Sequence, residues 1–337
     1  MGQFGVWLDL PDGWHGACVD RIEMNSQIKS LAGQRIGLFG RGGSGKSTCT
    51  VLLAKALVKA GYTVCVLDAD STNEGLPQAL GADKTPEPLL AWFGGTVFSG
   101  GPVTCPVDDP APIAGARLGP AQLPAKYVGR TSEGICMFQA GKIGPLGPGA
   151  GCDGPMTKIA RDFAFEPEGM APVTVVDFKA GVEDASRGVI TSLDWVIVVM
   201  DPSYAALHAG ATMKTLLGQM RAGFLPATRH LASAERIELT LRAYREARTQ
   251  GALFVLNKVP DSDTERLLGQ RLRELGLHTV ASIREDPALR QAWLQGDCLR
   301  SASAEAEADQ IVRELERQCG SPANRQSDRL SRMVTPP

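Results

Sequence analysis

Apolar and polar positions follow two alternating patterns along most of the chain. Some stretches are short and almost wholly apolar, which is typical of strands buried on both faces of a sheet, whereas others place apolar residues at helical spacing. The predicted strands lie at 35–40, 63–70, 173–178, 195–201 and 252–259. The predicted helices lie at 46–60, 203–222, 232–249 and 263–275. Strands that alternate with helices predict an α/β fold with a doubly wound, mostly parallel sheet.

Residues 84–135 interrupt this pattern, because Pro and Gly are crowded there. A structureless stretch of this length is uncommon inside a compact domain. We expect a helix near 86–93 and a hairpin in the remainder, and the insert is either a partner-binding surface or a divergent insertion. The expected organisation is an N-terminal extension at 1–33, a main domain at 34–318 that contains the insert, and a disordered tail at 319–337.

The composition of the 337 residues is that of an ordinary soluble globular protein, with 43% hydrophobic and 21% charged residues. A net charge of −2 gives no reason to expect a nucleic-acid partner, which requires a clustered basic face. No apolar run is long enough for a membrane span, and the first residues do not resemble a secretory signal. The eight cysteines are scattered, so we expect a reduced, cytoplasmic protein.

A glycine-rich loop follows the first predicted strand and leads into the first predicted helix. Its sequence, GRGGSGKS, fits the phosphate-loop pattern G-x-x-x-x-G-K-[ST] and indicates a P-loop NTPase. Backbone N–H groups of such a loop surround the phosphates, Lys46 adds a positive charge, and Ser47 offers a hydroxyl to Mg²⁺. The predicted nucleotide-binding residues here are Gly40, Arg41, Gly42, Gly43, Ser44, Gly45, Lys46, Ser47 and Thr48.

Carboxylates follow the second and third predicted strands. Asp68 and Asp70 stand at the end of the second strand, where Asp70 is either a functional carboxylate or a cap for the next segment. Asp177 ends the third strand, and Gly181 follows four residues later. This spacing suits a carboxylate close to Mg²⁺ and a glycine N–H that senses the γ-phosphate.

The doubled glycine after a basic residue resembles the deviant phosphate loop G-K-G-G-x-G-K-[ST]. That loop belongs to dimeric ATPases that include the nitrogenase iron protein, the septum-site, plasmid-partition and arsenite-transport ATPases, and the nickel-insertion ATPase of carbon monoxide dehydrogenase. The family's first lysine reaches the partner's nucleotide, and this sequence has Arg41 there. The resemblance therefore implies a homodimer in which Arg41 is catalytic, although a longer, planar group need not fit in the same way.

Two further positions take their expected roles from this resemblance. Asp70 falls where the family has the switch I aspartate that orients the attacking water, and Asp68 lies beside it at the strand tip. The stretch LNKV resembles the family's base-binding segment. Asn257 would then bind the adenine edge, with Lys258 packed beside it.

The segment after the third strand resembles switch II. Its sequence, DFKAGVEDASRG, is similar to the D-T-x-A-G-x-E-H-x-x-R-G stretch of the nickel-insertion ATPases. Glu183 and Arg187 match that stretch, whereas Asp184 replaces its histidine. Of the family's members, the chain is thus most similar to the nickel-insertion ATPases.

Cys152 lies in a glycine-rich stretch where relatives bind metal. It lacks the C-x-C pair of the nickel-insertion ATPases, and no cysteine lies between residues 153 and 297. Cys152 is either an inert thiol or one ligand of a nickel or zinc ion held between two subunits, with Asp153 or water completing the site and Cys136 a further candidate.

The expected function is that of a homodimeric ATPase that requires ATP and Mg²⁺. Nucleotide-driven closure of the dimer would serve metal or cofactor insertion into a client metalloenzyme. The alternative is a regulatory or positioning switch like the partition and septum-site ATPases. An iron–sulfur reductase is disfavoured, because a second cluster cysteine is missing from the sequence around switch II.

Overall fold

The computed structural model describes residues 29–95, 101–143, 152–224, 226, 228–229 and 231–320. Most of the expected N-terminal extension, and the tail from residue 321, lie outside the described residues. The last described helix ends at Cys319, the first residue of the expected tail.

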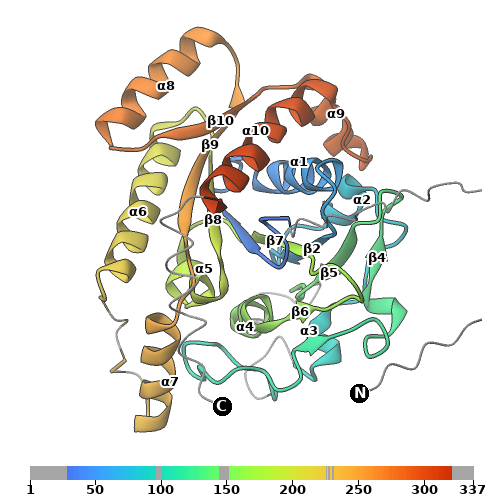
Figure 1. Cartoon of the computed structure of the whole chain (residues 1–337), viewed down its shortest axis with the longest axis vertical. Helices are drawn as coiled ribbons and strands as arrows, with labels where there is room; N and C mark the ends of the chain where they lie inside the picture. The colour runs from blue at the N-terminus through green and yellow to red at the C-terminus, as the bar shows by residue number, and fades with distance from the viewer. Residues whose placement is uncertain are drawn as a thin grey trace, which may run out of the picture.

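An eight-stranded sheet forms the centre of the molecule (Figure 1), with the strand order β10-β9-β8-β1-β7-β2-β5-β4. All neighbouring strands are parallel except β4 and β5, so the predicted doubly wound, mostly parallel α/β fold is confirmed. The strands are β1 Arg35–Phe39, β2 Val64–Ala69, β4 Gly129–Arg130, β5 Cys136–Gln139, β7 Val173–Phe178, β8 Trp195–Met200, β9 Gly251–Val259 and β10 Thr279–Arg284. A separate pair consists of β3 Arg117–Leu118 and β6 Ala164–Phe165.

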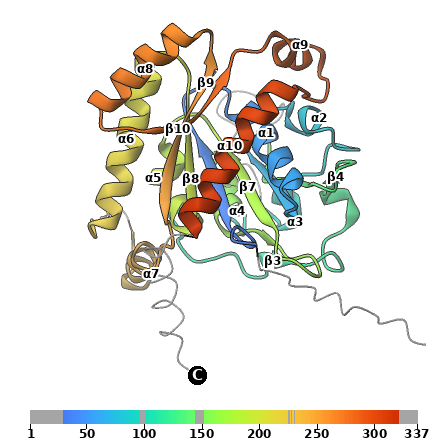
Figure 2. The same ribbon diagram turned by 45° about the horizontal axis from the view of Figure 1, so that its top comes forward.

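Helices cover both faces of the sheet and divide its apolar side chains into two clusters. On one face, α1 and α10 lie side by side (Figure 2). That face is covered by α1 Lys46–Lys59, α2 Leu76–Leu80, α9 Pro287–Gln295 and α10 Ala302–Cys319. The other face is covered by α3 Leu89–Trp92, α4 Gly154–Asp162, α5 Glu183–Ser186, α6 Tyr204–Arg221 and α8 Ser262–Glu274, with the short turn η2 Val189–Ser192. In the described part of α7 Ala234–Arg245 no residue is buried.

The central strands show why the sequence pattern was informative. Every residue of β2 and β8 is buried, as expected for strands covered by helices on both faces. Asp68 is the charged exception within β2, and it lies at the edge where the strands end. The fold thus brings the loops after β1, β2 and β7 together at the carboxyl edge of the sheet.

The insert is more ordered than its composition suggests. The helix expected near 86–93 is present as α3, and β4 and β5 form a hairpin at the end of the insert. Between them, the described residues are mostly irregular, but Val103, Leu123 and Tyr127 are buried in the apolar cluster that covers one face of the sheet. The sequence did not predict strands β5 and β10 or helices α4, α9 and α10, because the two strands are short or mixed with polar residues and the helices have few apolar residues among polar and charged ones.

Candidate nucleotide-binding and hydrolysis site

The glycine-rich loop joins β1 to α1, and its glycines fill positions that a side chain cannot. A Cβ on Gly40 would lie 2.3 Å from the carbonyl oxygen of Val199, and one on Gly45 would lie 2.1 Å from Asn257 Nδ2. Gly45 also has a φ of 87°, in the left-handed region, where it caps α1. The loop therefore packs closely against Val199 and Asn257 and presents the start of α1 to the cavity, where an anion can bind.

Two residues at the end of β9 hold this loop in place. Asn257 Nδ2 donates a hydrogen bond to the carbonyl oxygen of Ser44 at 2.8 Å, and Lys258 Nζ donates to that of Gly43 at 2.8 Å. Lys258 itself has a φ of 59°, which is uncommon for a residue with a side chain. The structure thus places both predicted residues beside the loop; the adenine contact of Asn257 stays a prediction.

Asp177 and Ser47 meet beside the loop, and their role toward magnesium stays a prediction. Asp177 Oδ2 accepts a hydrogen bond from Ser47 Oγ at 2.6 Å, and Asn73 Nδ2 donates to the same hydroxyl at 2.8 Å. Asp177 Oδ1 is buried and has no hydrogen-bond partner within the described part of the chain. Burial raises the pKa of Asp177 to about 6, against the opposing effects of Ser47 and Lys46.

Asp68 has a different environment from Asp177, although their strands are neighbours. Its Oδ2 pairs with Lys142 Nζ at 2.7 Å, and Lys142 also donates to the carbonyl oxygens of Asp70 and Asn73. Burial raises the pKa of Asp68 to about 7, although Lys142 opposes this shift. Asp68 therefore positions the loop after β2 through Lys142, a residue that no sequence pattern singled out.

Asp70 and Gly181 lie at the site but have partners in this conformation. Asp70 Oδ1 accepts hydrogen bonds from the backbone N–H of Thr72 at 2.9 Å and from its hydroxyl at 2.7 Å, so Asp70 caps a turn. Gly181 N donates to the carbonyl oxygen of Gly40 at 2.9 Å. The predicted contacts of Asp70 with the attacking water and of Gly181 with the γ-phosphate stay predictions. For the second contact, the hydrogen bond between Gly181 N and the carbonyl oxygen of Gly40 has to break.

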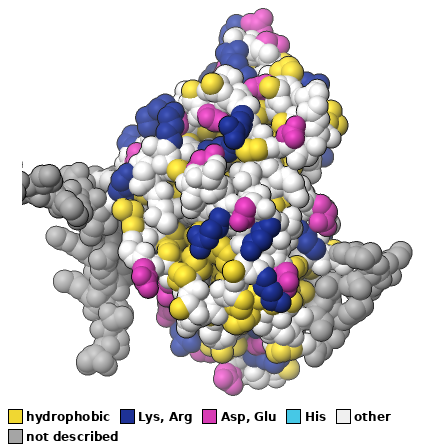
Figure 3. Space-filling model, turned by 90° about the vertical axis from the view of Figure 1, so that its right-hand side faces the viewer, with side chains coloured by type: hydrophobic (Ala, Val, Ile, Leu, Met, Phe, Trp, Pro, Cys, Tyr) yellow, Lys and Arg dark blue, Asp and Glu magenta, His cyan; other side chains and the backbone are white. Residues whose placement is uncertain are grey.

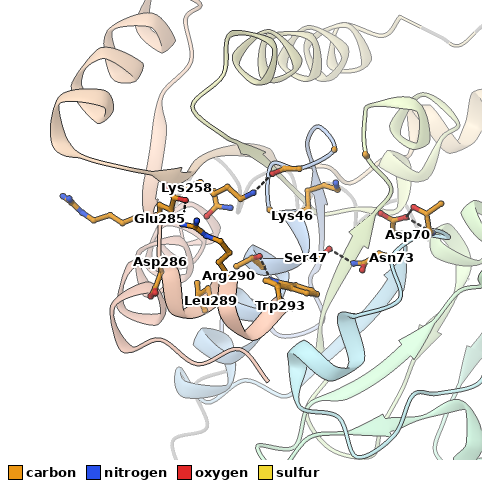
Figure 4. A pocket seen from close by; sticks show the side chains of 18 residues that line it. Lys46, Ser47, Asp70, Asn73, Lys258, Glu285, Asp286, Leu289, Arg290 and Trp293 are labelled. Carbon is orange, nitrogen blue, oxygen red and sulfur yellow. Dashed lines mark hydrogen bonds and ion pairs between the residues drawn. The ribbon is translucent and has the colours of Figure 1, made fainter. Parts of the chain in front are cut away.

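A cavity of about 720 Å³ extends from the loop toward α9 (Figure 4). Lys46, Ser47 and Asp70 line one part of it, and Leu289 and Trp293 of α9 line another. Trp293 Nε1 donates a hydrogen bond to Thr48 Oγ1 at 2.9 Å, which fixes the indole beside the start of α1. This wall was not expected from the sequence, although Asp286–Pro287 is a typical helix start and Asp286 does cap α9. The cavity also contains Arg284, Glu285, Asp286 and Arg290.

The geometry agrees with a comparison against protein families. The model of the family described as "CobQ/CobB/MinD/ParA nucleotide binding domain" matches residues 39–299. The chain belongs to this family. The prediction of a P-loop nucleotide-binding protein of the ATPase class is thereby confirmed at the level of the family.

Relatives and solved structures support this placement. An uncharacterized ATP-binding protein of Methanocaldococcus jannaschii is 31% identical over 52% of this chain and 69% of its own. The carbon monoxide dehydrogenase accessory protein CooC of Rhodospirillum rubrum is 27% identical over 54% of this chain and 68% of its own. The MinC:MinD cell division complex of Aquifex aeolicus matches 84% of this chain and 95% of that chain, with a TM-score of 0.52 and 16% identity. The last match concerns the fold alone.

Arg41 does not line the cavity described above, although it belongs to the glycine-rich loop. Its side chain is exposed, and Nη1 lies 3.5 Å from the hydroxyl of Ser203, which caps α6. Lys46, by contrast, is 6% exposed and lines the cavity. The two basic residues of the loop therefore face different surroundings, and a role for Arg41 on a partner's nucleotide stays a prediction.

The surroundings of Cys152 differ from those expected. Asp153 is paired with Lys179 and accepts a hydrogen bond from Ser71, so it is not available as a ligand. Cys136 lies at the start of β5, near the amino ends of the strands, whereas Asp153, which follows Cys152, contacts Ser71 beyond the carboxyl end of β2. Cys105 lies closer: the N–H of Gly154 donates to Cys152 Sγ at 3.4 Å, and a Cβ on Gly154 would lie 3.0 Å from Cys105 Sγ.

The described residues of one chain do not fit a complete transition-metal site. They contain no group of three or more His, Cys, Asp or Glu side chains that could hold a metal ion. Cys105 of the insert and Cys152 both lie against Gly154, and sequence spacing gave no sign of this. Over the same described ranges, no helix is both long and apolar enough to cross a membrane.

Proposed function

We propose that the protein is a Mg²⁺-dependent ATPase that works as a homodimer and uses nucleotide-driven closure to assist metal or cofactor insertion into a client metalloenzyme. The observation that carries the ATPase proposal is that Lys46 and Ser47 line the cavity while the buried Asp177 lies directly behind Ser47 and accepts a hydrogen bond from its hydroxyl. Lys46 supplies charge to the phosphates, and the open loop supplies backbone donors.

Magnesium fits the donor set at this wall. Asp177 Oδ1 is a buried carboxylate oxygen without a partner within the described residues, and Ser47 presents a hydroxyl beside it. Mg²⁺ prefers such oxygen ligands, directly or through water. When bound there, it neutralises phosphate charge. Asp70 lines the same cavity and would accept a hydrogen bond from the attacking water once its turn with Thr72 rearranges.

The α9 wall suits the nucleoside. Trp293 and Leu289 offer apolar surface, and a purine base can stack on an indole. Asn257 and Lys258 reach the same cavity from β9. Base binding there would leave the phosphates at the glycine-rich loop.

The maturation role has weaker support than ATP hydrolysis. It rests on similarity to the accessory protein CooC and on the two thiols, Cys105 and Cys152, that lie against Gly154. Two chains would contribute four thiolates, a set that suits zinc, nickel or an iron–sulfur cluster. The alternative is a regulatory or positioning switch; the fold likeness to MinD agrees with it but does not favour it.

ATP hydrolysis is tested with two lysines of one helix. Lys46→Ala should lower the rate at least about 100-fold, because it removes the charge beside the phosphates. Lys59→Ala is the matched control: Lys59 lies at the far end of α1, where it pairs with Asp309, and its loss should leave the rate unchanged. Equal rates for both variants would contradict the proposed site.

The dimer and the metal are tested separately. Sedimentation with and without ATP shows whether nucleotide drives association, and Arg41→Ala should then lower hydrolysis without weakening ATP binding. Anaerobic purification followed by metal analysis tests the thiols, with Cys105→Ala and Cys152→Ala as variants. Metal lost in both variants supports insertion; no metal in the wild-type protein favours the switch.

A further inference from the structure

Five residues form a row across the sheet near the amino ends of its strands. The register pairs Arg35 of β1 with Thr174 of β7, Thr174 with Cys65 of β2, Cys65 with Cys136 of β5, and Cys136 with Arg130 of β4. Residues directly opposite each other in neighbouring strands point to the same face. The row therefore places two thiols next to each other, with an arginine at each end.

The two thiols interact, and their environments differ. Cys65 donates a hydrogen bond to the sulfur of Cys136, and Arg130 Nη1 lies 3.3 Å from that sulfur. The hydrogen bond from Cys65 lowers the pKa of Cys136 to about 7, and the Arg130 guanidinium adds to this effect. The same interaction, with burial, raises the pKa of Cys65. Cys136 is thus the more acidic thiol of the pair.

Cys136 lies on β5, one strand in from the end of the sheet, and is nearer to the surface than Cys65. It is 6% exposed, whereas Cys65 is 1% exposed. Strand β4 is the last strand of the sheet, and Arg130 on it is exposed. Figure 3 views the molecule from the side of β4, where basic side chains lie among apolar ones. A small neutral oxidant can approach Cys136 from this side more readily than it can approach Cys65.

We propose that Cys136 and Cys65 form a site for oxidation by small hydroperoxides that ends in a disulfide. The Cys136 thiolate attacks a peroxide oxygen, the O–O bond breaks, and the leaving alkoxide or hydroxide takes a proton. Cys136 is now a sulfenic acid. The Cys65 thiol then attacks that sulfur, the S–O bond breaks, and the leaving hydroxide takes the proton of Cys65 and departs as water. Two thiols and one hydroperoxide give one disulfide, one alcohol or water, and one further water.

The strand register places the Cα atoms of Cys65 and Cys136 within the range that a disulfide can span. Neighbouring strands are about 4.8 Å apart, and disulfides span Cα separations of about 4.4–6.8 Å. The buried Cys49 is a contrast, because burial raises the pKa of its thiol to about 12. The oxidation of Cys136 and Cys65 requires neither ATP nor a metal, so its test is independent of the proposed function.

The test is peroxide treatment of the reduced, full-length protein, followed by alkylation and mass spectrometry of unreduced peptides. We expect a peptide pair linked through Cys65 and Cys136. Cys65→Ala should give no disulfide but should leave a sulfenic acid on Cys136 that dimedone traps. Cys136→Ala should lose both products.

Arg130 provides a graded test of the mechanism. Arg130→Gln should slow peroxide oxidation of Cys136 about three- to tenfold, because fewer thiolates are present, and Arg130→Lys should restore most of the rate. Circular dichroism of each variant shows whether the fold is kept. The proposal is wrong if both thiols remain alkylatable after peroxide, or if the only linkage found joins Cys105 to Cys152.

Discussion

The central sheet has an amino edge, where its parallel strands begin, and a carboxyl edge, where they end. Charged side chains have different contacts at these two edges. At the amino edge, Asp194 Oδ2 accepts a hydrogen bond from Arg35 N at 2.7 Å, and the Arg35 guanidinium donates to the carbonyl oxygens of Ala160 and Phe163 at the end of α4. At the carboxyl edge, Asp177 keeps an oxygen without a partner within the described residues. At the first edge Arg35 and Asp194 join elements to one another, whereas at the second edge Asp177 combines such a contact with an oxygen that is left for a ligand.

The largest expected effect is on hydrolysis at the carboxyl edge. Asp177→Asn should lower kcat at least about 100-fold, because it removes the carboxylate beside Ser47 that suits Mg²⁺. Asp194→Asn should leave kcat unchanged and cost about 1–2 kcal/mol of stability, because it weakens a charged hydrogen bond. Steady-state kinetics and urea unfolding measure the two quantities. If kcat falls in both variants, the proposed difference between the two edges is wrong.

The second effect is a pH dependence of stability without nucleotide. Because the pKa of Asp177 is raised from 3.8 to about 6, the folded state binds this proton more tightly, which stabilises it at low pH. That stabilisation is lost as the pH rises through about 6, and the shift corresponds to about 3 kcal/mol. Asp177→Asn should therefore gain up to about this much relative to wild type between about pH 4 and about pH 7. If the free energy of unfolding changes with pH in the same way in wild type and in Asp177→Asn, the raised pKa of Asp177 is contradicted.

A smaller effect is expected at the α9 wall. Trp293→Ala should raise the Kd for ATP about tenfold, since about 1.4 kcal/mol is a reasonable loss for an aromatic wall. Trp92→Ala is the matched control, because Trp92 contacts Tyr127 in the insert and does not line the cavity. Titration calorimetry with ATP measures both values. An unchanged Kd in Trp293→Ala would place the base elsewhere.

The smallest effect is expected from an exposed pair near the amino edge. Arg117 and Glu166 form an ion pair, but their side chains are 72% and 49% exposed. Arg117→Ala should lower stability by less than about 0.5 kcal/mol and leave hydrolysis unchanged. Calorimetric unfolding at low and high salt measures this. A larger loss of stability that decreases at high salt would show that the Arg117–Glu166 ion pair contributes more to stability than we expect.

The sequence predicted the five long apolar strands and the glycine-rich loop, and it failed for elements with a weaker local signal. Strand β10 mixes polar and apolar residues, and β5 has four residues after a Pro- and Gly-rich stretch. Their strand character comes from pairing with β9 and β2 rather than from their own pattern.

The sequence by itself determined the α/β class and the phosphate loop, because a continuous motif and a residue period are local properties of the chain. Only the tertiary structure decided which distant residues complete each site. Lys142 reaches Asp68, Trp293 reaches Thr48, and Cys136 reaches Cys65. Strand order and register bring these pairs together, and neither is written in the spacing of residues along the chain.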